Sequence, residues 1–358
     1  MSLRDSAALP LVSVTIVTYN SGRFIRRCLE TVLEQKYPRL EIIVIDNAST
    51  DGTADILETF EDRCAVIYNQ DNVGFAAAQN QAIGLARGEW VLTLNPDVFL
   101  LPGFIEALMI GAQIDPRAGT VCGKLLTIGA GFDIPDEPIV DSAGIYFTPM
   151  LRHFDRGSQQ FDNGHFLRYE YVFGATAAAA CYRRKMIEDV SVGGEFFDPD
   201  FFAYREDADL AWRAQLLGWK CVFVPYARAY HVRALRPGMR RAVPAEINMH
   251  SVKNRFLMRL KNVTASLYLR HLLPITVRDL GIVTYCLLRE QTSIKAFVFT
   301  IRNLRRMLEK RRWIQARRRV DDAYIEQWFR FSPVSLPLES QPHPAEVPVR
   351  AASGSHLQ

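Results

Sequence analysis

The chain has 358 residues, of which 49% are hydrophobic and 23% charged, a composition typical of a soluble globular protein with a sizeable core. The sequence predicts no signal peptide, and no run of about 18 uncharged apolar residues predicts a membrane-spanning helix. The six cysteines are scattered without a CxxC pair, which favours reduced thiols in a cytoplasmic protein.

The net charge of +4 hides an uneven distribution along the chain. Residues 245–331 contain 18 Lys and Arg against 7 Asp and Glu, whereas the remainder contains 25 against 32. Such a division suggests that the basic part meets something anionic.

Strand and helix patterns alternate over the first 128 residues, because β-branched apolar runs are followed by segments with helical spacing of apolar residues. This order predicts a parallel, doubly wound sheet. The predicted strands are Leu11–Thr18, Glu41–Asp46, Cys64–Tyr68 and Trp90–Leu94. The predicted helices are Ser21–Gln35, Thr50–Phe60, Phe75–Arg87 and Pro102–Ile114.

The alternation is lost in residues 129–170, which predict loops and a hairpin covering one face. Regular structure resumes with a strand at Tyr171–Tyr182, a helix at Ala208–Leu217 and a strand at Lys220–Val224. Long amphipathic helices follow from about Ala245, and a Pro- and Ser-rich tail ends the chain. We therefore divide the chain into an α/β domain (1–244), a basic helical region (245–331) and a disordered tail (332–358).

Two apolar strands end abruptly in polar side chains, in EIIVIDNASTD and in GEWVLTLNPDV. The carboxyl ends of parallel strands are where open α/β sheets bind ligands. Asp46, at the first of these ends, could accept a hydrogen bond from the N3–H of uracil or thymine, with Thr18, Tyr19 and Asn20 as the adjacent wall. A carboxylate that only caps the following turn is an equally good account.

Asp97 lies at the second end, in Asn-Pro-Asp. A single carboxylate together with substrate phosphates is how Mg²⁺ is commonly held, although a plain turn explains the same three residues. His231 could be a second metal ligand if it lies near Asp97, whereas a lone histidine is more often structural.

The densest acidic cluster, Glu206, Asp207 and Asp209, follows the aromatic segment FFDPDFFAY. Apolar surroundings could raise a carboxylate's pKa toward that of a general base. Favourable charge at a helix N-terminus is the simpler alternative. Upstream, the small-residue segment containing Asn72, Gly74 and Asn80 predicts a helix packed closely against ligand or sheet.

Four motifs, in order between Val12 and Val232, resemble the GT-A fold glycosyltransferases of family 2, which are inverting nucleotide-sugar transferases. They are VSVTIVTYNSG, IIVIDNASTDGT, NVGFAAAQNQAIGLARGEWVLTLNPDV and FFAYREDADLAWRAQLLGWKCVFVPYARAYH. The resemblance implies a GT-A catalytic domain in residues 1–244, with a Rossmann-like mixed sheet flanked by helices.

The resemblance also implies roles for individual residues. Asp207 would be the general base with Glu206 beside it, and Asp97 and His231 would hold a divalent metal, Mg²⁺ or Mn²⁺. The residues implied in nucleotide binding are Thr18, Tyr19, Asn20, Asp46, Asn72, Gly74, Asn80 and Asn95. Those implied on the acceptor or sugar side are Asp209, Trp212 and Arg213.

Three departures from the family pattern affect these roles. Asn95 stands at the first acid of the DxD motif, Gln79 stands where many relatives have Arg, and GGEFFDPDFF carries an extra residue. Asn-Pro-Asp with GFAAA-x-N is most similar to the rhamnosyltransferase-like branch, which uses dTDP-rhamnose. A UDP-sugar transferase and an inactive nucleotide-sugar binding module stay open, whereas a nucleotidyltransferase would need a Gly-rich basic loop that TYNSGRF lacks.

The basic segments within residues 253–319 interleave Lys and Arg with apolar side chains, a pattern typical of helices on an anionic membrane surface. We expect a cytoplasmic protein on the inner face of the plasma membrane, acting on a glycan or a polyprenyl-linked acceptor. The alternative is that these helices pack on the catalytic domain or on a second subunit, as in a homo-oligomer. No motif supports nucleic-acid binding.

Overall fold

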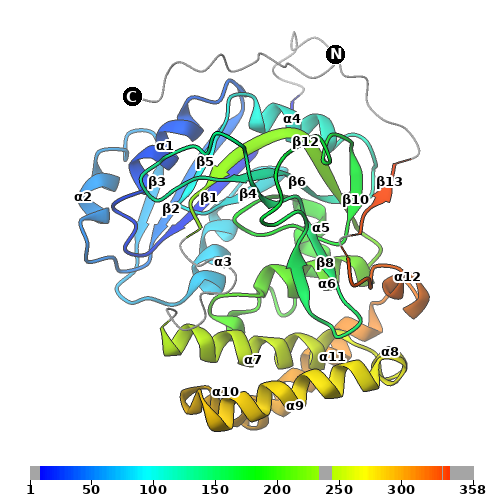
Figure 1. Ribbon diagram of the computed structural model, residues 1–358. Helices are drawn as coiled ribbons and strands as arrows, with labels where there is room; N and C mark the ends of the chain where they lie inside the picture. Colours follow the sequence, from blue (N-terminus) through cyan, green and yellow to red (C-terminus); the bar gives the residue numbers. More distant parts are fainter. Residues whose placement is uncertain (1–8, 234–243, 333, 339–358) are drawn as a thin grey trace.

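A computed structural model describes residues 9–233, 244–332 and 334–338 of the chain. Within them, eleven of thirteen strands form one mixed sheet, flanked by helices and followed by a further layer of helices (Figure 1). The other two strands, β8 and β9, pair with each other in a separate two-stranded sheet. The strands are β1 (Val12–Thr18), β2 (Leu40–Asp46), β3 (Ala65–Tyr68), β4 (Trp90–Leu94), β5 (Val98–Leu100), β6 (Ala118–Thr127), β7 (Val140–Ser142), β8 (Ile145–Phe147), β9 (His153–Asp155), β10 (Glu170–Val172), β11 (Ala179–Arg183), β12 (Lys220–His231) and β13 (Leu336–Pro337).

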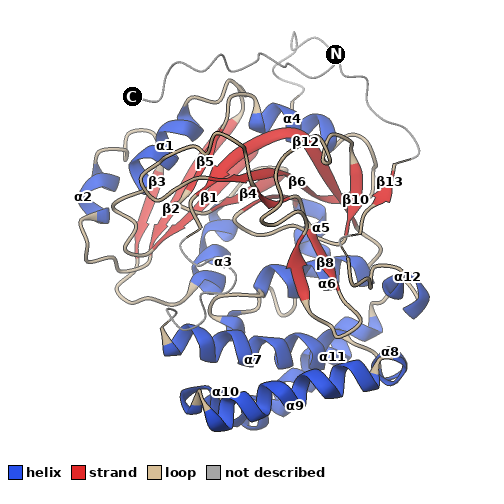
Figure 2. Cartoon of the chain, viewed as in Figure 1, coloured by secondary structure: helices blue, strands red, loops and turns tan. Residues whose placement is uncertain are grey.

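Figure 2 shows the strands gathered above a separate group of helices. The helices are α1 (Ile25–Leu33), α2 (Thr53–Glu58), α3 (Phe75–Leu85), α4 (Phe104–Gly111), α5 (Arg184–Val190), the 3₁₀ turn η2 (Pro199–Phe201), α6 (Glu206–Leu216), α7 (Ala245–Asn262), α8 (Ala265–Arg270), α9 (Leu272–Leu288), the 3₁₀ turn η4 (Gln291–Ser293), α10 (Ile294–Arg302), α11 (Leu304–Ala316) and α12 (Asp322–Glu326).

The sheet order is β13-β10-β12-β6-β11-β4-β1-β2-β3, with β5 on β12 and β7 on β6. The predicted strands before residue 95 are confirmed, and β1 pairs in parallel with both β2 and β4. Strands β1 to β4 run parallel, as the order of the first 128 residues predicted. The sheet as a whole is mixed, because β11 runs antiparallel to both β4 and β6. The mixed sheet that the family resemblance implied is the observed one.

The single strand predicted at Tyr171–Tyr182 is two strands in different places. β10 pairs with β12, whereas β11 lies between β4 and β6. Between them the backbone passes close to α6, since a Cβ atom on Gly174 would lie 2.2 Å from the Cβ of Ala211. The close approach requires glycine there and positions this loop beside the N-terminal part of α6.

The C-terminal helices pack against the α/β domain in two layers. Helix α7 contacts α6 and η2, and α10 and α11 contact α7. The tail is not wholly disordered, because β13 pairs with β10 at the edge of the sheet; residues 339–358 lie outside the described part. Among the helices that the structure describes, none has both the length and the apolar character needed to cross a bilayer.

Candidate active site

Thr18 and Asp46 lie next to each other where the parallel strands β1 and β2 end. The Thr18 hydroxyl donates to Asp46 Oδ1 over 2.7 Å, and the Ser49 hydroxyl donates to the same oxygen over 2.6 Å. Asp46 is buried, whereas Tyr19 is 51% exposed beside it. The carboxylate therefore has a fixed orientation next to an exposed aromatic ring, and it also caps the following turn as the simpler account expected.

Asn20 and Asn72 shape the loops at this edge. Asn20 adopts a left-handed backbone, with φ of 50°, and its side chain accepts from the Thr50 backbone N–H. Asn72 Oδ1 accepts from Asn47 Nδ2 and from the backbone N–H of Gly74. Asn47, which the sequence analysis missed, also accepts from the Val73 N–H, so it joins the loops after β2 and β3.

Gly74 begins α3 with φ of +86°, and no larger residue fits there. A Cβ atom would lie 2.5 Å from the Phe202 ring. The loop before α6 therefore rests directly on the start of α3. Because of this contact, the loop that carries Phe202 closes one side of the site.

Asp97 and His231 meet because β5 pairs with the end of β12, which sets His231 opposite Val98. Asp97 Oδ1 lies 3.5 Å from His231 Nε2. Asp141, on β7, lies 2.7 Å from the other ring nitrogen, Nδ1. Asn95 stands at the start of this turn and accepts the Val98 N–H with its backbone oxygen.

The electrostatics of this group depend on burial and on the two carboxylates. Burial alone would lower the pKa of His231, but Asp97 and Asp141 outweigh it and raise the pKa to about 10. Burial alone would raise the pKa of Asp97, but His231 holds it below its usual value. Without a metal, the imidazolium therefore carries the positive charge between two aspartates.

These residues fit a divalent metal shared with a substrate. A carboxylate oxygen and an imidazole nitrogen face each other, and the second imidazole nitrogen is held by Asp141, an arrangement that orients metal-binding histidines. Within the described ranges, no group of three His, Cys, Asp or Glu side chains could hold a metal by itself. Asp97 and His231 would therefore hold an ion whose other ligands are phosphate oxygens and water.

Asp207 lies at the start of α6 and has an unusually basic carboxylate. Burial and the negative charge of Asp155 raise its pKa to about 6, although it accepts the backbone N–H groups of Ala208 and Ala177. Burial also raises the pKa of Glu206 well above its usual value, and its Oε2 has no hydrogen-bond partner. Burial thus favours the neutral form of Glu206, whereas Asp207, with its pKa of about 6, can take up a proton.

Arg233 links this acidic pair to the histidine group. Its guanidinium lies 2.6 Å from Asp155 and 3.2 Å from Asp141. Burial would lower its pKa, but the two aspartates raise the pKa further above its usual value. One chain of charged side chains thus runs from Asp97 through His231, Asp141, Arg233 and Asp155 toward Asp207.

The backbone that leads into α6 is held in a rare conformation. Phe202, Tyr204 and Arg205 all have φ between 65° and 70°, which non-glycine residues seldom adopt. Asn254 on α7 holds the segment, because its side-chain amide donates to the carbonyls of Phe201, Ala203 and Tyr204. The C-terminal helical region therefore takes part in shaping the entrance to Asp207.

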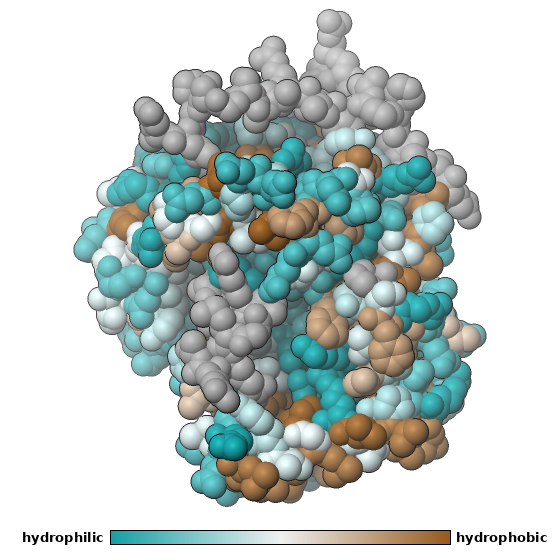
Figure 3. Space-filling model, in the orientation of Figure 1, coloured by the Kyte–Doolittle hydropathy of each residue, from teal (hydrophilic) through white to brown (hydrophobic). Residues whose placement is uncertain are grey.

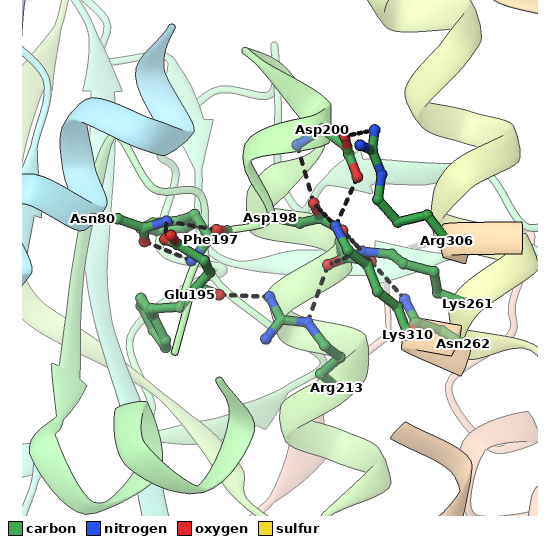
Figure 4. A network of polar contacts seen from close by, with 12 residues as sticks. Asn80, Glu195, Phe197, Asp198, Asp200, Arg213, Lys261, Asn262, Arg306 and Lys310 are labelled. Atoms are coloured by element: carbon green, nitrogen blue, oxygen red, sulfur yellow. Dashed lines mark hydrogen bonds and ion pairs between the residues drawn. The ribbon is translucent and has the colours of Figure 1, made fainter. Parts of the chain in front are cut away.

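The structure corrects the roles expected for Asp209, Trp212 and Arg213, because all three are at most 1% exposed. Asp209 pairs with Arg213 and Lys261, and Arg213 also donates to two backbone carbonyls (Figure 4). Trp212 lies in an aromatic core against Phe147, with ring centroids 4.8 Å apart. These residues support α6 from inside and cannot contact an acceptor.

Asn80 is likewise placed away from the site. Its amide donates to the Phe197 carbonyl and to Glu195, and its oxygen accepts the Phe197 N–H, so it joins α3 to the segment before η2 (Figure 4). The expected nucleotide contact is therefore wrong in this structure, since every polar atom of the side chain is already used. Besides Asn47, the sequence did not reveal three residues of the site: Asp141, Asp155 and Arg233. A carboxylate inside the apolar stretch IVDS was the available signal.

The fold defines the chain as a GT-A-like protein. It superimposes with a TM-score of 0.56 on a crystal structure of GalNAc-T7 with UDP, GalNAc and Mn²⁺, at 16% identity, covering 71% of this chain and 48% of that one. A crystal structure of S. aureus TarS gives a TM-score of 0.51 at 17% identity, covering 86% and 55%. At these identities the likeness concerns the fold alone.

The model of Glycosyl transferase family 2 matches residues 13–191, and that of Glycosyl transferase family group 2 matches residues 147–243. The chain belongs to glycosyltransferase family 2, as the four motifs predicted.

Among its relatives, the chain is 34% identical over 117 residues to the glycosyltransferase GlyG of Streptococcus pneumoniae, covering 32% of this chain and 38% of the relative. It is 42% identical over 91 residues to the putative teichuronic acid biosynthesis glycosyltransferase TuaG of Bacillus subtilis, covering 25% and 36%. The chain thus spans well under half the length of these two relatives.

A longer match joins the chain to the N-acetylglucosaminyl-diphospho-decaprenol L-rhamnosyltransferase of Mycobacterium tuberculosis. The two are 27% identical over 259 residues, which cover 64% of this chain and 78% of the relative. This similarity supports the rhamnosyltransferase-like branch that Asn-Pro-Asp and GFAAA-x-N predicted.

Proposed function

We propose that this protein transfers a sugar from a nucleotide diphosphate to an acceptor hydroxyl with inversion at the anomeric carbon. The observation that carries this proposal is Asp207, a carboxylate with a pKa of about 6 at the start of α6. General bases work best when their pKa lies near the working pH. The edge formed by Thr18 and Asp46 would bind the nucleotide base on the other side of the site.

The proposed reaction is one in-line displacement. Asp207 takes the proton from the acceptor hydroxyl as the oxygen attacks the anomeric carbon, and the bond to the diphosphate breaks. A divalent ion held by Asp97 and His231 would supply positive charge to the departing diphosphate. Arg233 keeps Asp155 paired and lowers the pKa of Asp207, which keeps that base within the working range.

For the donor we propose dTDP-rhamnose, supported by the 27% identity to a rhamnosyltransferase. A UDP-sugar is the second candidate, since the hydrogen bond expected at Asp46 suits uracil and thymine equally. We expect purified protein with Mn²⁺ to release dTDP from dTDP-rhamnose by slow hydrolysis, and to release little nucleotide from UDP- or GDP-sugars. Chromatographic detection of the free nucleotide measures this.

Release of UDP alone would keep the mechanism and overturn the sugar. If no donor binds in calorimetry and none is hydrolysed, the transferase proposal fails. An inactive binding module would bind a donor without releasing nucleotide, even when candidate acceptors are supplied.

The proposed metal site predicts a role for Asp141, which orients His231 without facing the ion. We expect Asp141→Asn to raise the Mn²⁺ concentration for half-maximal nucleotide release about 10- to 100-fold, because loss of such an orienting carboxylate weakens metal binding by that much. Titration of the free Mn²⁺ signal by electron paramagnetic resonance measures binding directly. Asp136→Asn, in an exposed loop, is the matched control. An unchanged half-saturating concentration would count against the metal site.

We further propose that the protein acts at a membrane surface, although not through the basic residues of 253–262. Lys253, Arg255, Arg259 and Lys261 are all buried, and Lys261 pairs with Asp198 and Asp209. Much of the basic excess is balanced in this way, since residues of α11 also pair with acids of the α/β domain. The expectation that residues 253–262 form a lipid-binding surface is therefore wrong.

The surface that supports membrane contact is apolar instead. Figure 3 shows a hydrophobic band across the bottom of the molecule, where α9 and α10 lie in Figure 1. We name it the apolar face; its residues are Leu272, Leu273, Val277, Leu280, Leu287, Leu288 and Ile301, each between 43% and 76% exposed. Exposed basic residues at its margin include Arg289, Lys295 and Arg302. Such a combination suits an anionic bilayer surface.

A further inference from the structure

Four arginines converge on His153 from elements that are distant in the sequence. We name them the arginine cluster: Arg152 in the β8–β9 turn, Arg205 before α6, Arg255 on α7 and Arg278 on α9. His153 lies at its centre, since Arg205 contacts its Nδ1 over 3.1 Å. Arg278 donates to the Met150 carbonyl of the same hairpin over 3.3 Å.

Helix α7 contacts this group through Ser251 and contributes Arg255 to it. Arg205 is bonded to the carbonyl and the hydroxyl of Ser251, and Arg255 lies one helical turn further on, on the same face. Arg255 is only 6% exposed, and its Nε has no hydrogen-bond partner. Within the described residues, the carboxylate that acts on Arg255 and Arg278 is Asp279, which pairs with Arg259 at 2.8 Å.

Positive charge at Arg255 and Arg278 is therefore poorly compensated. Burial and then the other arginines depress the pKa of Arg255 well below its usual value, and they lower the pKa of Arg278 to about 9. Burial and the four arginines hold the pKa of His153 well below its usual value, so that the imidazole is neutral. A folded protein keeps such a group of cations when an anion completes it.

Strand β9 connects the arginine cluster to the proposed catalytic base, and helix α9 connects it to the apolar face. His153 and Asp155 are two residues apart on β9, so their side chains project to the same side of the strand. Asp155 acts on the charge of Asp207, and His153 faces the arginines. On α9, Arg278 is directly preceded by Val277, which is 64% exposed, and Leu280 follows at 61%.

We propose that the arginine cluster binds the diphosphate of a lipid-linked acceptor, whose hydrocarbon chain leaves along the apolar face of α9. This inference rests on the proposed transfer to a hydroxyl at Asp207, because a sugar attached to that diphosphate would then reach the base. Several guanidinium groups suit a diphosphate, since each can donate two hydrogen bonds to phosphate oxygens. The hydrocarbon chain of the acceptor would lie against the apolar face, out of contact with water, and would continue into the bilayer.

Binding of farnesyl diphosphate to the full-length protein, measured by calorimetry, tests this assignment without a donor. We expect Arg255→Met with Arg278→Met to weaken binding by at least about tenfold, because bonds to charged groups are lost. Leu273→Asp is expected to weaken farnesyl diphosphate but not inorganic pyrophosphate. Arg305→Met, at a side chain that is 94% exposed, is the matched control and should change neither affinity.

The thermal midpoint separates a binding role from a structural one. Removing Arg255 and Arg278 relieves repulsion, so we expect the midpoint of the double variant to stay level or rise; a large fall would make these arginines structural. Displacement of farnesyl diphosphate by dTDP with Mn²⁺ would assign the arginine cluster to the donor and overturn the proposal.

Binding to phosphatidylglycerol vesicles, by the wild type and by the arginine variant, is the last measurement. If the arginine variant loses vesicle binding but keeps farnesyl diphosphate, the anion is a lipid headgroup and the proposal fails. Absence of farnesyl diphosphate binding to the wild type also overturns it. Each result is independent of donor hydrolysis, so failure here is distinguishable from failure of the transferase proposal.

Discussion

Replacing Asp207 by asparagine should lower the rate constant of sugar transfer by about a thousandfold while leaving donor binding intact. General-base catalysis supplies roughly 10²- to 10⁴-fold in rate, and the amide cannot accept the proton. The backbone N–H of Ala208, which now donates to the Asp207 carboxylate, can donate to the oxygen of the new side-chain amide, so α6 should begin unchanged. Steady-state kinetics with donor dissociation constants from calorimetry measure both quantities.

The same substitution should alter the dependence of the rate and of stability on pH. With a pKa of about 6, the wild type should gain kcat/KM as pH rises through 6. The folded state binds this proton more tightly than the unfolded chain, so wild-type stability falls as pH rises from about 4 to about 6. Asp207→Asn removes that fall and should be more stable above pH 6, by up to about 3 kcal/mol. Denaturant unfolding at pH 5 and pH 8 measures the difference.

Asp155→Asn is the companion variant, because Asp155 raises the pKa of Asp207. We expect it to shift the rising limb of the pH–rate profile to lower pH and to leave the chemistry possible. A profile that does not move, together with a small loss of rate in Asp207→Asn, would show that another group takes the proton. Glu206, with its raised pKa, would then be examined by Glu206→Gln.

Replacing Lys261 by methionine should cost about 3–5 kcal/mol of unfolding free energy. Lys261 is 1% exposed and lies between Asp198 and Asp209, with Nζ 3.0 Å from Asp209 Oδ2 (Figure 4). Removing one partner of a buried ion pair leaves the other charge uncompensated, and here two carboxylates lose their lysine. Denaturant unfolding followed by circular dichroism measures the loss.

Arg305 provides the control for this prediction, since it pairs with Glu309 at 3.1 Å at a side chain that is 94% exposed. Such surface pairs contribute at most about 1 kcal/mol, so Arg305→Met should be nearly neutral. A loss below about 1 kcal/mol in Lys261→Met would mean that Lys310 and Arg213 compensate, and that α7 is not fixed to α6 by this charge. Because the proposed base Asp207 lies in the first turn of α6, we also expect Lys261→Met to lower the rate of transfer.

The strands that carry Asp46 and Asn95 could be predicted because their evidence is local. Each is an unbroken apolar run ended by polar residues, and such a run forms a buried strand wherever it lies in the sheet. Asp97, Asp207 and His231 were singled out by ordered motifs around them, and the structure brings Asp97 and His231 within 3.5 Å. The same motifs also predicted the family.

Local patterns could not separate residues that face substrate from those that face the interior. Asp207 and Asp209 are two residues apart on one helix. Asp207 lies in the proposed site, whereas Asp209 is fully buried and accepts a hydrogen bond from Lys261. The basic pattern of residues 253–262 is equally compatible with a helix on a membrane surface and with a helix packed against the rest of the protein. Long-range ion pairs decide this, because a charge becomes buried only where a partner from elsewhere in the chain reaches it.

The sequence by itself thus determined the α/β fold and the family and singled out the carboxylate that we propose as the base, since short motifs and strand periodicity encode them. Only the tertiary structure decided that Asp141, Asp155 and Arg233 complete the site, that Asp209, Trp212 and Arg213 support it from inside, and that the exposed face of α9 is apolar. Most of these features arise where segments distant in the sequence meet, and no local pattern specifies which side chains of two distant segments will face each other.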